Sequence, residues 1–173
     1  MEKNAEISSL PNPDHIGIVV RDVDKTVEFL SLAGVPGPWK VFNHEAKDGL
    51  VVGAPFKIKI GAAKVGSVVF ELIQPLDSDS VWARFLESKG EGIQHLAFGV
   101  SSFDEWVSRL KAQGYGIVVG GRVSLEVEND TMKAVGDPNG DRWCYLENSS
   151  QGGGFIIEFM DNLDNPLGLS PLF

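Results

Sequence analysis

Two stretches of the 173-residue chain decide its fold: DHIGIVVRDVDKTVEFLSLAGV (residues 14–35) and QHLAFGVSSFDEWVSRLKAQGY (residues 94–115). They align at a constant offset, so that His15 falls on His95. Each copy begins with a short apolar strand, continues through a polar turn into an amphipathic helix, and ends at a glycine that suits a left-handed helix cap. The chain therefore contains two copies of one structural unit.

Strand-like segments follow each predicted helix, so the repeated unit is one strand, one helix and about three further strands. These segments lie at about residues 50–60, 65–74, 117–123, 131–136, 142–147 and 154–160. Residues 34–38 and 43–55 combine Gly, Pro and polar side chains, which predicts loops. We expect an α+β fold in a single domain, 1–173. Its parts are a first module over about 12–76, a linking helix over about 78–90, a second module over about 92–161 and a tail over 162–173.

Composition excludes several classes of protein. Lys and Arg number 15 against 24 Asp and Glu, and the net charge of -9 offers no general attraction to nucleic acid or an anionic membrane. The single cysteine, Cys144, cannot form an internal disulfide, and no apolar run reaches the roughly 18 residues that a membrane-spanning helix needs. The first residues lack the basic-then-apolar pattern of a signal peptide, so we expect a cytoplasmic protein without nucleic-acid or membrane partners.

Four of the strand segments each carry one side chain of a type that binds metal ions. Because successive side chains of a strand point to opposite faces, each strand can be divided into two sets. Each histidine shares its face with small residues, which leaves space in front of the imidazole, and each glutamate lies within an otherwise apolar strand. The four residues are His15, Glu71, His95 and Glu158.

Each of these residues also has an ordinary structural interpretation. A lone histidine on an apolar strand is commonly a hydrogen-bonded core residue, and a lone strand glutamate is commonly solvated at a sheet edge. A carboxylate buried within an apolar strand is destabilising unless it is paired or bound to a metal. Two carboxylates and two imidazoles at equivalent places in a repeat would form a site for a divalent ion. The pattern alone leaves both interpretations open.

Four motifs make the chain similar to the vicinal oxygen chelate superfamily, which includes glyoxalases, bleomycin-resistance proteins and dioxygenases. They are D-H-I-G-I-V-V-R-D-V-D (14–24), V-V-F-E-L-I-Q-P (68–75), G-I-Q-H-L-A-F-G-V (92–100) and G-G-G-F-I-I-E-F (152–159). The resemblance implies two tandem βαβββ modules that form an open, cupped, mixed β-barrel around one divalent ion per site. It implies His15, Glu71, His95 and Glu158 as the ligands, and cobalt, manganese, nickel, zinc or iron(II) as the ion.

Within that superfamily the chain most resembles methylmalonyl-CoA epimerases, through the linking segment P-L-D-S-D-S-V-W-A-R-F-L-E-S-K-G-E-G-I-Q-H (75–95). The resemblance implies an epimerase or isomerase that removes a proton next to a carbonyl group, with Glu158 as one catalytic base. Those epimerases carry a second glutamate base on the strand before the one that bears Glu71, and residues 55–60 hold no carboxylate. The nearby candidates for a second base are Glu45, Asp48, Lys57 and Lys59.

Other functions are compatible with the same ligands. A glyoxalase I-like lyase, acting on lactoylglutathione, needs one base and shares a four-ligand metal set, and a non-catalytic protein that binds or sequesters a small molecule needs none. Oxygen-dependent ring cleavage uses a two-histidine, one-carboxylate triad, and Glu71 as a fourth ligand argues against it. We expect a small-molecule carbonyl or thioester substrate and, from exposed edge strands, a homodimer. The pattern identifies no substrate-binding residue.

Overall fold

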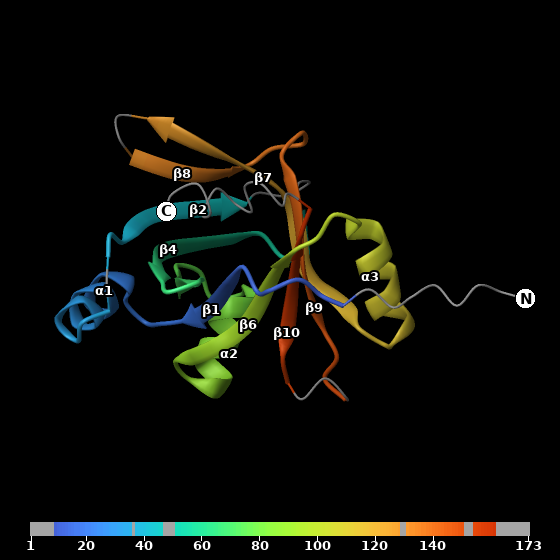
Figure 1. Ribbon diagram of the computed structural model, residues 1–173, viewed down its shortest axis with the longest axis horizontal. Helices are drawn as coiled ribbons and strands as arrows, with labels where there is room; N and C mark the ends of the chain where they lie inside the picture. Colours follow the sequence, from blue (N-terminus) through green and yellow to red (C-terminus); the bar gives the residue numbers. More distant parts are fainter. Residues whose placement is uncertain (1–8, 36, 47–50, 129–130, 151–153, 162–173) are drawn as a thin grey trace, which may run out of the picture.

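A computed structural model describes residues 9–35, 37–46, 51–128, 131–150 and 154–161. Three helices and ten strands are described in it (Figure 1). The strands are β1 (His15–Val19), β2 (Lys40–Ala46), β3 (Val51–Val52), β4 (Phe56–Val65), β5 (Val68–Pro75), β6 (Gly92–Gly99), β7 (Gly116–Glu128), β8 (Thr131–Gly136), β9 (Asp141–Glu147) and β10 (Ile156–Met160). The helices are α1 (Val23–Leu32), α2 (Val81–Lys89) and α3 (Phe103–Ala112).

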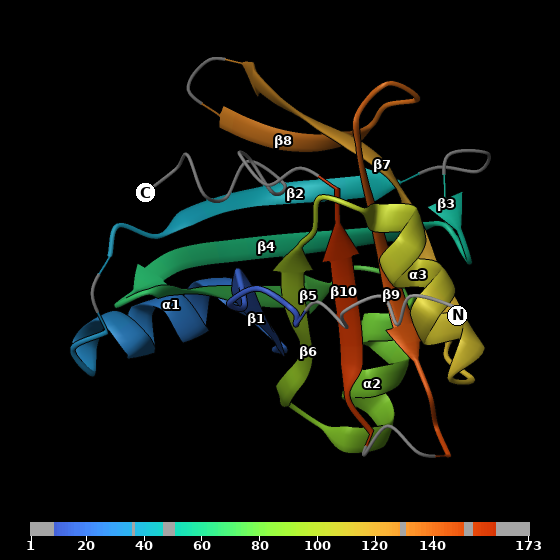
Figure 2. The ribbon, with the colours of Figure 1, turned by 45° about the vertical axis from the view of Figure 1, so that its right-hand side comes forward.

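The described strands form one mixed sheet in the order β3-β7-β8-β2-β4-β5-β1-β6-β10-β9. Its two halves have equivalent strand pairings. Strands β1 and β6 pair antiparallel where the halves meet, β5 runs parallel to β1, and β10 runs parallel to β6. The sheet curls until β9, at one end, pairs with β7 near the other end. Figure 2 shows the result, with β2 and β4 running across the view while β6, β10 and β9 run up it. The predicted α+β fold of two βαβββ units in a cupped mixed sheet is confirmed.

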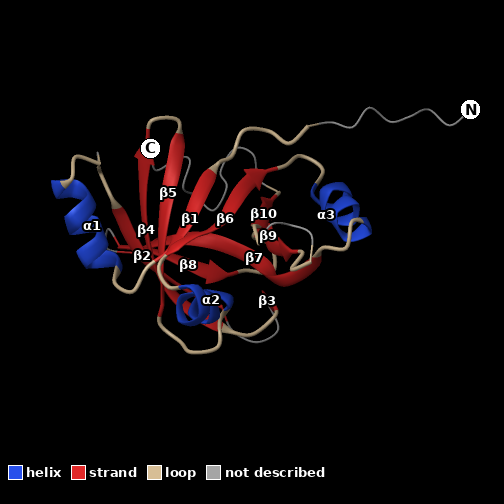
Figure 3. Ribbon diagram, turned by 90° about the horizontal axis from the view of Figure 1, so that it is seen from below, coloured by secondary structure: helices blue, strands red, loops and turns tan. Residues whose placement is uncertain are grey.

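The three helices occupy different sides of this cup (Figure 3). Apolar side chains of α1 pack on the outer face of β1 and β5, and those of α3 pack on the outer face of β6, β9 and β10. Helix α2 contributes to the interior instead, because Trp82 is 1% exposed and belongs to the cluster inside the barrel. The two repeated helices therefore cover the outside, and the linking helix closes part of the inside.

Local sequence explains the helix ends. The side chains of Asp22 and Ser80 accept hydrogen bonds from the backbone N–H groups of Lys25 and Ala83, which caps α1 and α2. Ser102 precedes α3 without such a side-chain bond, although Glu105 follows it at the spacing of a capping box. Gly34, which follows α1, has a φ of 88°, a conformation that favours glycine.

One sequence-based expectation needs correction, and two others fall outside the described chain. A loop was expected from residue 43, yet residues 43–46 belong to β2, which pairs with β4 along its whole length. The predicted tail, 162–173, and residues 47–50 of the predicted loop lie outside the described residues. Among the residues that are described, no helix is both long and apolar enough to cross a membrane.

Candidate metal centre

The four central strands carry the four predicted site residues to the inside of the barrel. On β1, β5, β6 and β10 the side chains alternate between the interior cluster and the outer layers that contact α1 and α3. The interior set includes His15 and His95, each 0% exposed, Glu71 at 2% and Glu158 at 1%. Sequence alternation therefore assigned each of these side chains to the correct face.

Strand register places the four side chains at one level of the barrel. In the β1–β6 pair, Gly17 lies opposite His95 and His15 lies opposite Ala97. Gly17 is also paired with Glu71 of β5, and Ala97 is paired with Glu158 of β10. Each histidine thus lies opposite a small residue. Glu71 is on the strand next to Gly17, and Glu158 is on the strand next to Ala97.

Gly17 is required by the position of the His95 ring. A Cβ atom added at Gly17 would lie 1.8 Å from Cε1 and 2.2 Å from Nε2 of His95, far inside van der Waals contact. The imidazole occupies the space that the missing side chain leaves. A glycine in the middle of a strand, which is unfavourable for the strand itself, here allows two histidines to approach each other.

One ligand atom from each of the four residues lies within 4.8 Å of all the others. The Nε2 atom of His15 is 3.1 Å from Oε2 of Glu158 and 3.3 Å from Oε2 of Glu71. The Nε2 atom of His95 is 3.2 Å and 3.5 Å from the same two oxygens, and 3.4 Å from Nε2 of His15. Two nitrogens and two carboxylate oxygens therefore converge on one point.

A neighbouring side chain holds the other nitrogen of each imidazole. The Nδ1 atom of His15 is 3.0 Å from Oδ1 of Asp14, and the Nδ1 atom of His95 is 3.2 Å from Oε1 of Gln94. Both partners are acceptors and precede their histidine directly, so they repeat at the same offset as the histidines themselves. With Nδ1 held in this way, Nε2 is the nitrogen directed at the centre, and it can bind an ion once it gives up its own proton, as in metal-bound histidines with a carboxylate or carbonyl partner.

Burial and mutual attraction determine the charges of the cluster. Burial acts to lower the pKa of His15, but the charge of Glu71 and the hydrogen bond to Asp14 outweigh it, and the pKa is raised well above its ordinary value. The pKa of His95 is raised in the same way by the two glutamates. Burial acts to raise the pKa of Glu71 and of Glu158, yet the two imidazoles lower both. The cluster thus pairs protonated imidazoles with ionised carboxylates.

The donor set fits a divalent cation. Two imidazole nitrogens and two carboxylates suit zinc, cobalt, nickel, manganese or iron(II). Among the described residues, Oε1 of Glu158 is a buried carboxylate oxygen without a hydrogen-bond partner, an arrangement that is unfavourable unless something else binds it. His15, Glu71, His95 and Glu158 are therefore the residues that could hold such an ion.

A small cavity of about 20 Å³ adjoins the cluster. Glu71 and Glu158 line it together with residues that the sequence did not single out: His44, Ile58, Ile60, Ile73, Trp82, Trp143 and Tyr145. The hydroxyl oxygen of Tyr145 is 3.2 Å from Nε2 of His95. Burial and the nearby carboxylate of Glu158 raise the pKa of Tyr145 well above its ordinary value, so its hydroxyl stays protonated.

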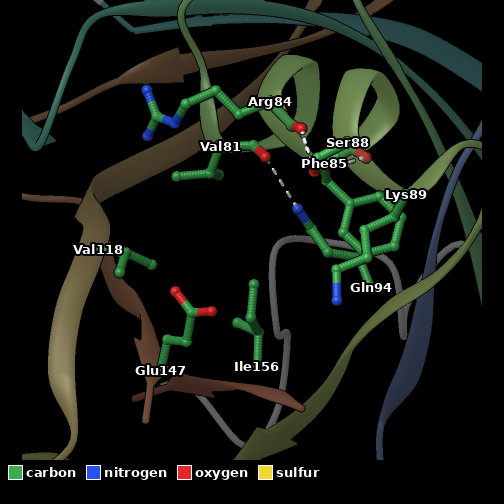
Figure 4. Close-up of a pocket in the computed structure, with 9 residues that line it drawn as sticks. All are labelled: Val81, Arg84, Phe85, Ser88, Lys89, Gln94, Val118, Glu147 and Ile156. Atoms are coloured by element: carbon green, nitrogen blue, oxygen red, sulfur yellow. Dashed lines mark hydrogen bonds between the residues drawn. The ribbon is translucent and has the colours of Figure 1, made fainter. Parts of the chain in front are cut away.

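A larger hollow of about 190 Å³ lies away from the cluster, between α2 and the strands β6, β7, β9 and β10 (Figure 4). Arg84, Lys89 and Glu147 are its charged lining residues, and none of the four cluster residues lines it. Gln94 connects the two regions, because its Nε2 atom donates to the backbone oxygen of Val81 while its Oε1 atom contacts His95.

Of the predicted alternatives for a second base, the three that the structure describes do not line the cavity. Glu45 and Lys57 form an ion pair, with Nζ of Lys57 3.4 Å from Oε1 of Glu45, and the Lys57 side chain is 60% exposed. Lys59 pairs with Asp24 on the outer side of β4, where α1 packs. Asp48 lies outside the described residues.

Comparison with known proteins identifies the family. The sequence profile of the Glyoxalase/Bleomycin resistance protein/Dioxygenase superfamily matches residues 14–132, and the chain belongs to this superfamily. The uncharacterized protein YqjC of Bacillus subtilis (strain 168) is 40% identical over 101 residues. That match covers 58% of this chain and 65% of YqjC, which is less than two thirds of the relative.

Two solved structures share the fold. The hypothetical protein BH1468 from Bacillus halodurans C-125 has a TM-score of 0.57 and 23% identity, with 87% of this chain and 94% of that chain covered. The methylmalonyl-CoA epimerase from Mycobacterium tuberculosis has a TM-score of 0.55 and 25% identity, with 90% of each chain covered. The fold that the sequence motifs implied is therefore shared with an epimerase and with a hypothetical protein.

Proposed function

We propose that the protein is a divalent-metal-dependent epimerase or isomerase that removes a proton next to a carbonyl group, with a methylmalonyl-CoA-like thioester as its substrate. One observation carries the proposal: a buried cluster of two imidazoles and two carboxylates in which one oxygen of Glu158 has no partner. The similarity to a methylmalonyl-CoA epimerase supports the substrate class. His15, Glu71, His95 and Glu158 are proposed as the ligands.

Glu158 is the proposed base. Its Oε2 atom contacts both imidazoles, while its Oε1 atom is buried without a hydrogen-bond partner in the described chain and belongs to a residue that lines the cavity. The two oxygens can therefore divide their tasks, one holding the cluster together and the other accepting the proton from carbon. A divalent ion bound at the cluster would act as a Lewis acid and stabilise the negative charge that develops on the carbonyl oxygen.

Two donors in the cavity wall are proposed to orient the substrate. The Tyr145 hydroxyl stays protonated and can donate to a carbonyl or carboxylate oxygen. The Nε1–H group of Trp82 is buried and has no acceptor among the described residues, so a substrate oxygen would satisfy it. A cavity of about 20 Å³ has room for about one water molecule, so the lining side chains would have to move apart for the acyl end of a thioester to reach the cluster.

The test is deuterium exchange at the α-carbon. The metal-free protein is reloaded with Co²⁺ and incubated with methylmalonyl-CoA in D₂O, and deuterium in the recovered thioester is measured by mass spectrometry. We expect incorporation by the wild type and a loss of about 100-fold or more in Glu158→Gln, the usual contribution of a general base. Tight thioester binding without any incorporation, whatever the metal, would replace the proposal with a non-catalytic binding role.

The matched control is Glu147→Gln, a glutamate of the neighbouring strand that lines the other hollow rather than the cluster cavity. It is expected to exchange deuterium like the wild type. The expected homodimer and the expected cytoplasmic location stay predictions; sedimentation of the purified protein tests the first.

A further inference from the structure

His44 is a buried histidine that the proposed ligand set does not include. On β2 the inward residues are Phe42, His44 and Ala46, while Asn43 is exposed between them. The His44 side chain is 5% exposed, and its strand is fixed by pairing with β4, where His44 lies opposite Ile58. The strand that brings it into the barrel is thus part of the central sheet and not a surface loop.

His44 and Glu158 belong to opposite walls of the barrel. In the described sheet, β4, β5, β1 and β6 lie between β2 and β10 in one direction, and β8, β7 and β9 lie between them in the other. Four strands separate β2 from β10 in one direction and three in the other, so the two strands face each other across the interior. Both residues line the same cavity, which places them at the same level of the barrel.

The surroundings of His44 leave its imidazole available for chemistry. The ring packs edge-on against Phe56, at 4.9 Å between centroids, and against Trp143, at 6.2 Å. No hydrogen bond joins either ring nitrogen to another part of the described chain. Two aromatic rings therefore fix the imidazole in place without occupying its nitrogens.

The imidazole is also in the protonation state that a base requires. Burial lowers the pKa of His44 to about 4, and the charges of Glu71 and Glu158, which face it from β5 and β10, offset only part of that effect. Lys57 and Lys59 of the neighbouring strand β4 are directed outward, toward Glu45 and Asp24. His44 is thus neutral near pH 7 and can accept a proton.

We propose that His44 is the second proton-transfer residue of the site, acting on the face of the reacting carbon opposite to Glu158. The inference rests on the proposed function, because exchange of a hydrogen between the two faces of a planar carbon needs one proton donor or acceptor on each side. The chain carries no carboxylate at residues 55–60, and Glu45 and Lys57 are paired outside the barrel. Within the described cavity lining, His44 is the titratable group that faces Glu158 from the far wall.

The proposed step removes one proton from the α-carbon and returns one proton to it. In one direction ionised Glu158 takes the α-proton, the electron pair of the broken C–H bond enters the carbon–carbon double bond of the enolate, and His44, which has first taken a proton from water, supplies that proton to the other face. In the reverse direction neutral His44 takes the α-proton, and Glu158, which has first taken a proton from water, returns one. Each turnover leaves the pair in the opposite protonation state, and exchange with water restores it.

The test compares the two epimers of methylmalonyl-CoA separately in D₂O, with Co²⁺-loaded wild type, His44→Gln and Asn43→Ala. Asn43 is the matched control, because it precedes His44 on β2 and is exposed on the outer face. We expect His44→Gln to lose interconversion of the epimers by about 100-fold or more, the usual effect of removing a general base. It should still exchange deuterium into the one epimer whose α-hydrogen faces Glu158, and Asn43→Ala should behave like the wild type.

Several results would decide against the inference. Interconversion by His44→Gln at the wild-type rate would overturn it, and so would an equal loss of exchange with both epimers in a variant that binds Co²⁺ normally, since His44 would then only support the barrel. If His44→Gln does not fold, His44→Asn is used with the same readout. A wild type that exchanges neither epimer would overturn the proposed function as a whole, whereas failure of the variants alone overturns only the role of His44.

Discussion

Binding of Co²⁺ to the metal-free protein is predicted to release about two protons per ion near pH 6.5, because metal ligands must be deprotonated. In the metal-free cluster the pKa values of His15 and His95 are raised, and those of Glu71 and Glu158 are lowered. Two imidazolium ions and two carboxylates have no net charge. One divalent ion that replaces the two protons preserves that neutrality, which a buried site favours.

The size of the effect follows from the number of protons. Each proton released makes the apparent affinity change about tenfold per pH unit, so two protons give about 100-fold, or about 2.7 kcal/mol, per unit. Isothermal titration calorimetry of Co²⁺ binding in two buffers of different ionisation enthalpy measures the proton number directly. Repeating the titration between about pH 6 and 7.5 measures the slope independently.

The matched variant is Glu71→Gln, which keeps an oxygen ligand but removes one of the two negative charges that hold the imidazoles protonated. It is expected to release about one proton and to bind Co²⁺ with half the pH slope. Binding heats that are independent of the buffer, together with an affinity that does not change with pH, would refute the charge assignment of the cluster.

Three further variants test other parts of the account. Gly17→Ala should displace His95 and lower Co²⁺ content at least about tenfold by elemental analysis, whereas Gly116→Ala, whose Cβ would meet no atom within 4 Å, should bind normally. Gln94→Leu should weaken Co²⁺ binding about 10- to 100-fold, the usual effect of removing a partner of a metal-bound histidine; unchanged affinity by calorimetry would show that this hydrogen bond is dispensable. Because the pKa of buried His44 is about 4, the unfolded chain binds its proton first as the pH falls below about 6.5, and stability should decrease by up to about 3 kcal/mol toward pH 4. Urea unfolding of the wild type and His44→Gln measures this, and identical pH dependences would contradict it.

Much of the fold and the proposed cluster could be predicted because both depend on local pattern. The repeat at residues 14–35 and 94–115 defined equivalent strands and helices, and alternation within each strand assigned His15 and His95 to the inner face. Asp14 and Gln94 repeat with the histidines, so their role in holding each imidazole could have been read from the same alignment.

The opposite wall of the barrel could not be predicted in the same way. Residues 40–46 mix polar and apolar side chains, and they form β2 because β4 offers a pairing partner, which is a long-range effect. Alternation of Phe42, His44 and Ala46 was the available signal, but it becomes informative only once the segment is known to be a strand. Tyr145 was missed because an aromatic residue in an apolar strand is ordinarily core.

The central claim is that four side chains from four strands hold one divalent ion, and anomalous diffraction from crystals of the Co²⁺-loaded protein tests it most directly. We expect one strong anomalous peak per chain, bonded to Nε2 of His15, Nε2 of His95 and a carboxylate oxygen each of Glu71 and Glu158, and its loss in His95→Ala. No peak at the cluster, or the same peak persisting in that variant, would contradict the account.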